Sequence, residues 1–283
     1  MDRLTFTPLL TKPRIRADSR NMLASDDFLR RLPRCIQPVE RLRFETLLFA
    51  HDLMEIALDR LYAVGCGYDE NSRIDAERFS LFSDAWTIID QVHVVRQVLK
   101  ALTKPETRAT DTQAYIDDFA TAQSLRNRMD HLNQNLPNRA KAAGSTNAMF
   151  GMLSFFRPCS DRWADGLAAG EIRGDLFLIS AGSAAGNIVG AMPLHEMDIH
   201  LPICSFKLDA FDMTFLLERA VLQLRPLLRR LSGDLLSNVE ARVDDLASAS
   251  GLPRDELLRT EAGHIVVRMD MCLMVDHTSQ PSA

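Results

Sequence analysis

The chain has 283 residues, of which 46% are hydrophobic, and its net charge at pH 7 is -5. The hydrophobic content is enough for a core and excludes a disordered chain, and the length allows one large domain or two small ones. The acidic balance, with a pI of about 5.8, excludes a strongly basic protein that binds nucleic acid or membranes without specificity. Any contact with nucleic acid therefore needs a local basic patch.

The first 38 residues are expected to form an irregular, arginine-rich arm. Prolines interrupt this segment, and it holds the one basic cluster of the chain. The arginines of that cluster are Arg14, Arg16, Arg20, Arg30, Arg31 and Arg34. Two arrangements are open, a mobile arm and a segment that lies across the surface. Because the N-terminus has no long apolar stretch, no signal peptide is expected, and the cytoplasm is the default location.

Three long amphipathic helices are predicted next. Apolar residues recur about every 3.6 positions from Val39 to the glycine pair that ends at Gly67. The same spacing runs from residue 75 to the break at Pro105, and a third helix runs from about residue 111 to residue 136. Long helices with short joints indicate an antiparallel bundle.

The pattern changes between about residues 147 and 207, where apolar and polar residues alternate. The segments AMFGMLSFF, EIRGDLFLIS, NIVGAM and DIHLPICSFKL predict four strands of a small antiparallel sheet. A further long helix is expected over residues 209–248, either kinked at Pro226 or divided at Gly233. Residues 251–283 are expected to contain a strand-like segment, GHIVVRMDMCLM, and a tail.

These elements predict a mainly α (α+β) fold. Three helices are too few to close a bundle, so the helix after the sheet is the natural fourth. The sheet is then an insertion between the third and fourth long helices of a bundle that spans residues 39–250.

One stretch raises the possibility of a membrane span. Residues 176–194 carry no charge, and their glycines match the small-residue spacing of membrane helix pairs. However, several glycines, polar residues and Pro193 interrupt the stretch. Two buried strands joined by a turn are the preferred interpretation, so no membrane contact is expected.

Neither the cysteines nor the histidine pair near residue 200 indicates a bound metal. The cysteines are Cys35, Cys66, Cys159, Cys204 and Cys272. They are scattered and form no CxxC pair, which favours small buried side chains in a reducing compartment. His195 and His200 enclose two acidic residues, but this short segment reads as a strand with surface histidines. No cofactor is expected either, since nucleotide-binding and hydrolase motifs are absent.

Two polar clusters lie on the first two predicted helices. Asp84 and Asp90 lie near His93 on the second helix, and His51 and Glu55 lie on the first. The ordinary interpretation of both clusters is the solvated face of a bundle helix. Asp84 and Asp90 are kept as possible supporting residues of a site.

The stretch SLRNRMDHLNQN, residues 124–135, carries the strongest functional signal. Arg126 and Asp130 are four residues apart and can form an ion pair, which would be a purely structural role. Asn127 and His131 are also four apart and share a face. Arg126 and His131 lie about 140° apart round a helix, so they can act together only toward a groove shared with another helix or subunit.

Residues 126–131 spell R-N-x-x-x-H, which resembles the R-polar-x-x-x-H signature of the HEPN superfamily. Members of that family are α-helical bundles that carry the motif late on the third main helix, as predicted here. The resemblance covers about residues 39–136, with 209–248 as the closing helix. It implies a homodimer with two motifs facing across a shared cleft, and a metal-independent ribonuclease of toxin–antitoxin or antiviral defence systems. Other members only bind RNA, nucleotides or proteins, including a cognate antitoxin.

The resemblance assigns a role to each residue of the motif. His131 would be the general acid or base, Arg126 would hold the scissile phosphate and Asn127 would position it. Arg128 would add attraction for RNA. Two alternatives stay open: a binding module without catalysis, whose sheet edge accepts a partner strand, and a structural bundle in which the polar face has no chemical role.

Overall fold

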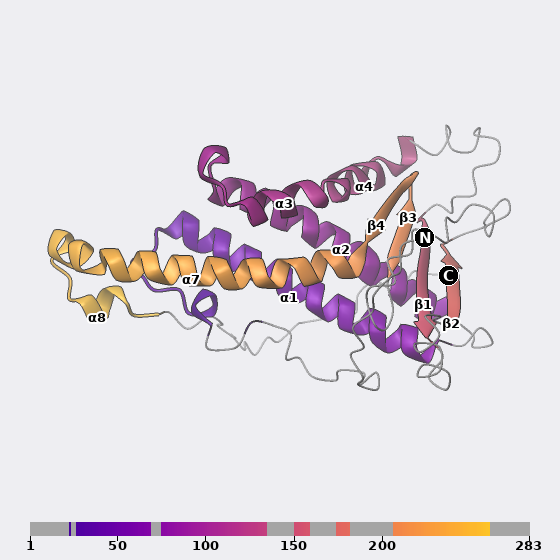
Figure 1. Cartoon of the computed structure of the whole chain (residues 1–283), viewed down its shortest axis with the longest axis horizontal. Coiled ribbons are helices and arrows are strands. Elements are labelled where there is room, and N and C mark those ends of the chain that lie inside the picture. Colours follow the sequence, from indigo (N-terminus) through magenta and orange to yellow (C-terminus); the bar gives the residue numbers. More distant parts are fainter. Residues whose placement is uncertain are drawn as a thin grey trace, which may run out of the picture.

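Long helices and one small sheet make up the described part of the chain (Figure 1). The computed structural model describes residue 23 and residues 27–68, 75–134, 150–158, 174–181 and 206–260. The expected mainly helical class with a small antiparallel sheet is confirmed for these residues.

The first two expected helices are present. Helix α1 spans Pro38–Gly67 and helix α2 spans Asp75–Leu102. Pro38 suits the first turn of α1 because it needs no hydrogen-bond acceptor there. The two helices pack together over much of their length, and residues such as Met54 and Ile88 are fully buried in the core.

The third expected helix is two helices, which corrects the prediction of one continuous element. Helix α3 spans Thr110–Asp118 and helix α4 spans Thr121–Asp130. Phe119 ends α3 and is buried, with its ring 4.8 Å from the Tyr115 ring and 6.0 Å from the Phe215 ring. Tertiary packing at Phe119, rather than a glycine or proline, therefore accompanies the break.

The sheet has the order β2-β1-β3-β4 and is antiparallel throughout. Strands β1 (Met152–Pro158) and β2 (Gly174–Ser180) match two of the expected strands. Strand β3 (Lys207–Ala210) begins at the end of the fourth expected strand, whereas NIVGAM lies outside the described residues.

Strand β4 (Met213–Leu216) corrects the prediction of a helix from residue 209. Phe211 and Asp212, at φ 55° and 63°, form the turn that joins β3 to β4. Two central residues with positive φ are typical of a tight hairpin, although glycine or asparagine usually fills these positions. The chain is therefore extended up to Leu216 and becomes helical only at Leu217.

Helix α7 spans Leu217–Ser250 as one continuous helix. It crosses the length of the molecule, with the sheet at its beginning and the short helix α8 (Arg254–Leu257) at its far end (Figure 1). Pro226 neither ends nor divides it. Pro226 lies on the exposed side of α7, so water can reach the backbone carbonyl in the preceding turn, which has no amide partner because proline lacks an N–H.

Part of the N-terminal arm packs against the bundle. The short helix η1 (Phe28–Arg30) contacts α1 and α7, and its Leu29 side chain is buried. A second short helix, η2 (Pro105–Thr107), follows α2. Residues 1–22 and the C-terminal segment 261–283 lie outside the described residues.

The uncharged stretch begins in β2, and residues 182–194 are outside the description. No helix among the described residues has the length and apolar character that a membrane crossing requires.

Candidate functional site

The predicted motif lies on α4, which packs against α2 in the opposite direction. Arg96 of α2 donates to the carbonyls of Ile116 and Ala120, whereas Asp90, earlier on α2, approaches Arg126, later on α4. This pairing places side chains of both helices on one polar surface. We call Asp90 and His93 of α2, with Arg126 and Asp130 of α4, the α2–α4 face.

Arg126 contacts the carboxylates of this face as ion pairs without hydrogen bonds. Its Nε lies 3.9 Å from Asp90 Oδ1 and 3.8 Å from Asp130 Oδ2, and its side chain is 39% exposed. It makes no hydrogen bond to any residue that the structure describes. In contrast, Arg225 donates to both oxygens of Glu55 at 2.5 and 2.7 Å. The guanidinium donors of Arg126 therefore remain available to an anion.

The other motif residues are exposed on α4. His131 is the residue that ends the helix, and its backbone N–H donates to the carbonyl of Asn127 at 3.2 Å. Arg128 donates from Nη1 to the carbonyl of Phe211 at 3.1 Å, which ties α4 to the β3–β4 turn. The structure thus brings Arg126 together with Asp90, whereas Arg128 is directed to the sheet.

Asp84 is not part of the α2–α4 face. It lies about 120° round α2 from Asp90 and accepts hydrogen bonds from the guanidinium of Arg60 on α1. The Asp84 side chain is buried, so the interpretation of Asp84 as a solvated residue is wrong. Its role is an ion pair between α1 and α2.

His93 is a member of the face that the sequence did not single out as a site residue. It follows Asp90 by three positions on α2 and is half-buried, and its Nδ1 is buried with no hydrogen-bond partner among the described residues. Burial, and then the charges of Arg126 and Arg96, lower the pKa of His93. Burial raises the pKa of Asp90, opposed by Arg126.

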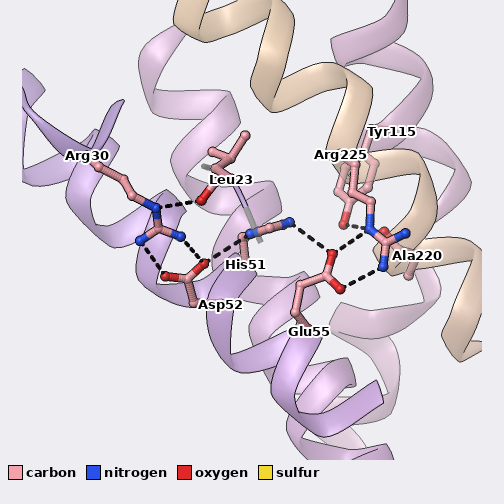
Figure 2. A network of polar contacts seen from close by, with 8 residues as sticks. All are labelled: Leu23, Arg30, His51, Asp52, Glu55, Tyr115, Ala220 and Arg225. Carbon is pink, nitrogen blue, oxygen red and sulfur yellow. Dashed lines mark hydrogen bonds and ion pairs between the residues drawn. The ribbon is translucent and has the colours of Figure 1, made fainter. Parts of the chain in front are cut away.

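A second polar cluster lies inside the bundle, where charged side chains alternate in sign (Figure 2). Arg30 of η1 donates to both oxygens of Asp52 at 2.8 and 2.9 Å. His51 Nδ1 lies 3.3 Å from Asp52, and its Nε2 lies 3.2 Å from Glu55. Glu55 is in turn held by Arg225 of α7. This ion chain joins η1, α1 and α7 through side chains that are distant in sequence.

The ion chain corrects the interpretation of His51 and Glu55 as a solvated face, because the two side chains are only 1% and 2% exposed. Burial opposes a charged imidazole, but Asp52 and Glu55 together raise the pKa of His51. Burial likewise opposes the Glu55 carboxylate, but His51 and Arg225 lower the pKa of Glu55. The charges stabilise one another.

Replacing Arg225 with methionine should lower the free energy of unfolding by about 3–5 kcal/mol at pH 7, because the buried Glu55 carboxylate loses its bidentate partner. Arg219→Met on the same helix is the control. Arg219 pairs with Asp118 at the surface, so its loss should cost less than about 1 kcal/mol. Urea unfolding measures both, and equal small losses would contradict the stabilising role of the ion chain.

Glu218, in the first turn of α7, is the one strongly perturbed carboxyl group among the described residues. It is 6% exposed, and its Oε2 has no hydrogen-bond partner. Burial raises its pKa from 4.5 to about 8, opposed by the charge of Arg225. Its proton therefore stabilises the fold fully below pH 4.5, and this contribution is lost as the pH rises through about 8.

Glu218→Gln should remove this pH dependence. Between pH 5.5 and pH 9 the variant should gain roughly 3 kcal/mol in free energy of unfolding relative to the wild type, since glutamine cannot ionise. Denaturant unfolding at several pH values measures the difference. Glu240→Gln, at an exposed position on the same helix, should show the same pH dependence of the free energy of unfolding as the wild type. A parallel pH profile for Glu218→Gln would show that Glu218 is not a buried acid.

A cavity of about 520 Å³ lies at the other end of α7, between η1, α7 and α8. Its lining includes the apolar residues Phe28, Leu236, Val239 and Leu258, and Arg254 also lines it. It contains no residue of the predicted motif.

Among the described residues, no group of three or more histidine, cysteine, aspartate or glutamate side chains could hold a metal ion. His195 and His200 lie outside the described residues, as do three of the five cysteines. Cys35 is half-buried and free.

Comparisons with protein-family models, with curated proteins and with solved structures give no significant match.

Proposed function

We propose that this protein is an RNA-directed, HEPN-like, metal-independent endoribonuclease, and that Arg126 and His131 act in the cleft of a homodimer. The observation that carries the proposal is Arg126. It lies half-exposed on α4, at ion-pair distances of 3.8 and 3.9 Å without hydrogen bonds to described residues. An arginine in this state can exchange its carboxylate contacts for a phosphate at little cost.

The chemistry needs only the RNA and these side chains. A histidine removes the proton from the 2′-hydroxyl, whose oxygen attacks the adjacent phosphorus. The bond from phosphorus to the 5′-oxygen breaks, and that oxygen takes up a proton. Arg126 offsets the negative charge that builds on the phosphoryl oxygens, while Asn127 orients the phosphate. The products are a 2′,3′-cyclic phosphate and a 5′-hydroxyl.

A dimer is proposed because one copy of α4 does not aim both groups at one point. Arg126 and His131 are separated by about 140° round the helix axis and by about 7 Å along it. Both lie on the outer side of the bundle, where a second α4 would form the other wall of a cleft. We assign such a protein to the cytoplasm, in a toxin or defence role in which a cognate antitoxin would be its protein partner.

A binding module without catalysis is the second candidate. It is favoured by Asp90 and Asp130, which lie 3.9 and 3.8 Å from Arg126 Nε and offset part of the positive charge that Arg126 would need to stabilise a cleavage transition state. Such a module would hold RNA, a nucleotide or a protein partner on the same face.

One experiment separates the two candidates. End-labelled single-stranded RNA is incubated with the purified protein in EDTA, and both binding and cleavage are recorded. If the protein is a ribonuclease, RNA fragments should accumulate with time and with protein concentration. Retained RNA without fragments would support the binding module, and neither binding nor cleavage would contradict both candidates.

A further inference from the structure

His93 has one ring nitrogen inside the protein and one at its surface. Nδ1 is buried and has no hydrogen-bond partner among the described residues. Nε2 makes no hydrogen bond to a described residue either, but unlike Nδ1 it is not a buried atom without a partner. Nε2 is therefore the nitrogen that the described residues leave open to a ligand, on the side of α2 that also carries Asp90.

The proton of the neutral ring belongs on Nε2. A proton on Nδ1 would be a buried donor without an acceptor, whereas a bare Nδ1 leaves only an unused lone pair. The charged ring is disfavoured too, since burial and then Arg126 lower the pKa of His93. At neutral pH this arrangement gives an uncharged ring with its N–H directed toward solvent.

Positive charge predominates around this N–H. The positive charges of Arg96 and Lys100 on α2 lower the pKa of His93, as Arg126 of α4 does. Among the charged groups that act on His93, only Asp90 raises its pKa. Arg96 is already engaged by the carbonyls of Ile116 and Ala120. Asp130 of α4 is the remaining charged group of the face, and it contacts Arg126 at 3.8 Å. Lys100 lies about two turns beyond His93, roughly 10 Å further along the axis of α2. Arg126 is therefore the cation that can join His93 in binding a ligand.

We infer that His93 and Arg126 form a binding site for a phosphate group, in which Nε2–H of His93 and the guanidinium of Arg126 both donate to its oxygens. The phosphodiester of RNA is the expected ligand, and this choice rests on the proposed function. The anion site itself is inferred from the contacts between α2 and α4, independently of the proposed function. His93 lies on the opposite side of Arg126 from His131, because the two helices run in opposite directions. Arg126 would thus lie between two consecutive phosphates of the RNA, with the cleaved phosphate toward His131 and the next phosphate toward His93.

The test follows the His93 ring by NMR in protein labelled on histidine, with His93→Gln to assign the signal. Inorganic phosphate should raise the pKa of His93 by about one unit in the wild type, because a bound anion favours the charged ring. Sodium chloride at equal ionic strength should not. In Arg126→Gln the phosphate effect should disappear, and Asp90→Asn should bind phosphate about fivefold more tightly. Asp118→Asn, which removes a surface carboxylate of α3, is the matched control.

An equal shift with chloride, or an unchanged phosphate effect in Arg126→Gln, would overturn the site. A DNA oligonucleotide, which lacks the 2′-hydroxyl and is not cleaved, serves as the second probe. It should shift the same signal and compete with phosphate. A phosphate effect in a protein that does not cleave RNA would reject the proposed function and keep the site. Cleavage of RNA without any effect of phosphate or DNA on His93 would reject the site alone.

Discussion

His131→Ala should lower the rate of RNA cleavage at pH 7 by roughly 100-fold or more, because a general acid or base contributes at least this factor. The side chain is exposed at the end of α4, so the thermal unfolding of the variant should match the wild type. Arg126→Ala should cause a similar loss, because the proposed mechanism uses Arg126 to offset charge on the phosphate. Arg126→Lys should restore part of the rate, since lysine keeps the charge without the bidentate geometry.

The matched control for Arg126 is Arg254→Ala. Arg254 is an exposed arginine near the far end of α7, where it pairs with Asp244. Its removal changes the net charge by the same amount, so a general loss of attraction for RNA would appear in both variants. Cleavage rates that fall equally in Arg126→Ala and Arg254→Ala would contradict a specific role for α4. An unchanged rate in His131→Ala would contradict the assigned acid–base group.

Mixing the two inactive variants should restore about a quarter of the wild-type activity. If each site takes Arg126 from one protomer and His131 from its partner, a mixed dimer of Arg126→Ala and His131→Ala keeps one intact site of two. Random exchange makes about half of the dimers mixed. The geometry of α4 favours this result, because the two side chains point about 140° apart on one helix.

The mixing experiment carries its own control. His131→Ala mixed with the double variant Arg126→Ala/His131→Ala contains no intact pair in any combination, so it should stay inactive. Mass measurements confirm that subunits exchange. Failure of the single variants to restore activity after exchange would place Arg126 and His131 of one protomer in the same site and contradict the shared cleft.

The long helices could be predicted because their signals are local. The apolar period from Val39 onward placed α1 within two residues of its observed ends, Pro38 and Gly67. The break between α3 and α4 had no such signal. It occurs at Phe119, an ordinary helix-compatible residue, whose buried ring packs against Phe215 on a strand about 100 positions away.

The β3–β4 hairpin was missed for a related reason. Its turn uses Phe211 and Asp212 at positive φ, where sequence patterns lead one to expect glycine or asparagine. Phe211 is buried and its ring packs edge-on against Trp86 of α2. A contact with a distant helix thus accompanies a backbone conformation that the residue type does not favour.

The polar residues show the same limit. His51 and Glu55 looked solvated because histidine and glutamate usually are, yet Arg225, 170 positions away, makes their burial possible. The R-N-x-x-x-H stretch of α4 could be recognised in the sequence, and Asp90 was a candidate beside it, but the contact at 3.9 Å between Arg126 and Asp90 could not be predicted. The place of His93 on the same surface as Arg126 could not be predicted either, because it depends on the antiparallel contact of α2 with α4.

The most direct measurement of the central claim is the chemistry of the cleaved ends. The protein is incubated in EDTA with an RNA oligonucleotide and with the same sequence carrying 2′-O-methyl groups, and the products are identified by mass spectrometry. We predict 2′,3′-cyclic phosphate and 5′-hydroxyl ends from the RNA, no products from the methylated strand, and no products from either with His131→Ala. Cleavage of the methylated strand, or RNA fragments that carry 5′-phosphate ends, would contradict a site in which Arg126 and His131 direct the 2′-hydroxyl of RNA onto its own phosphate.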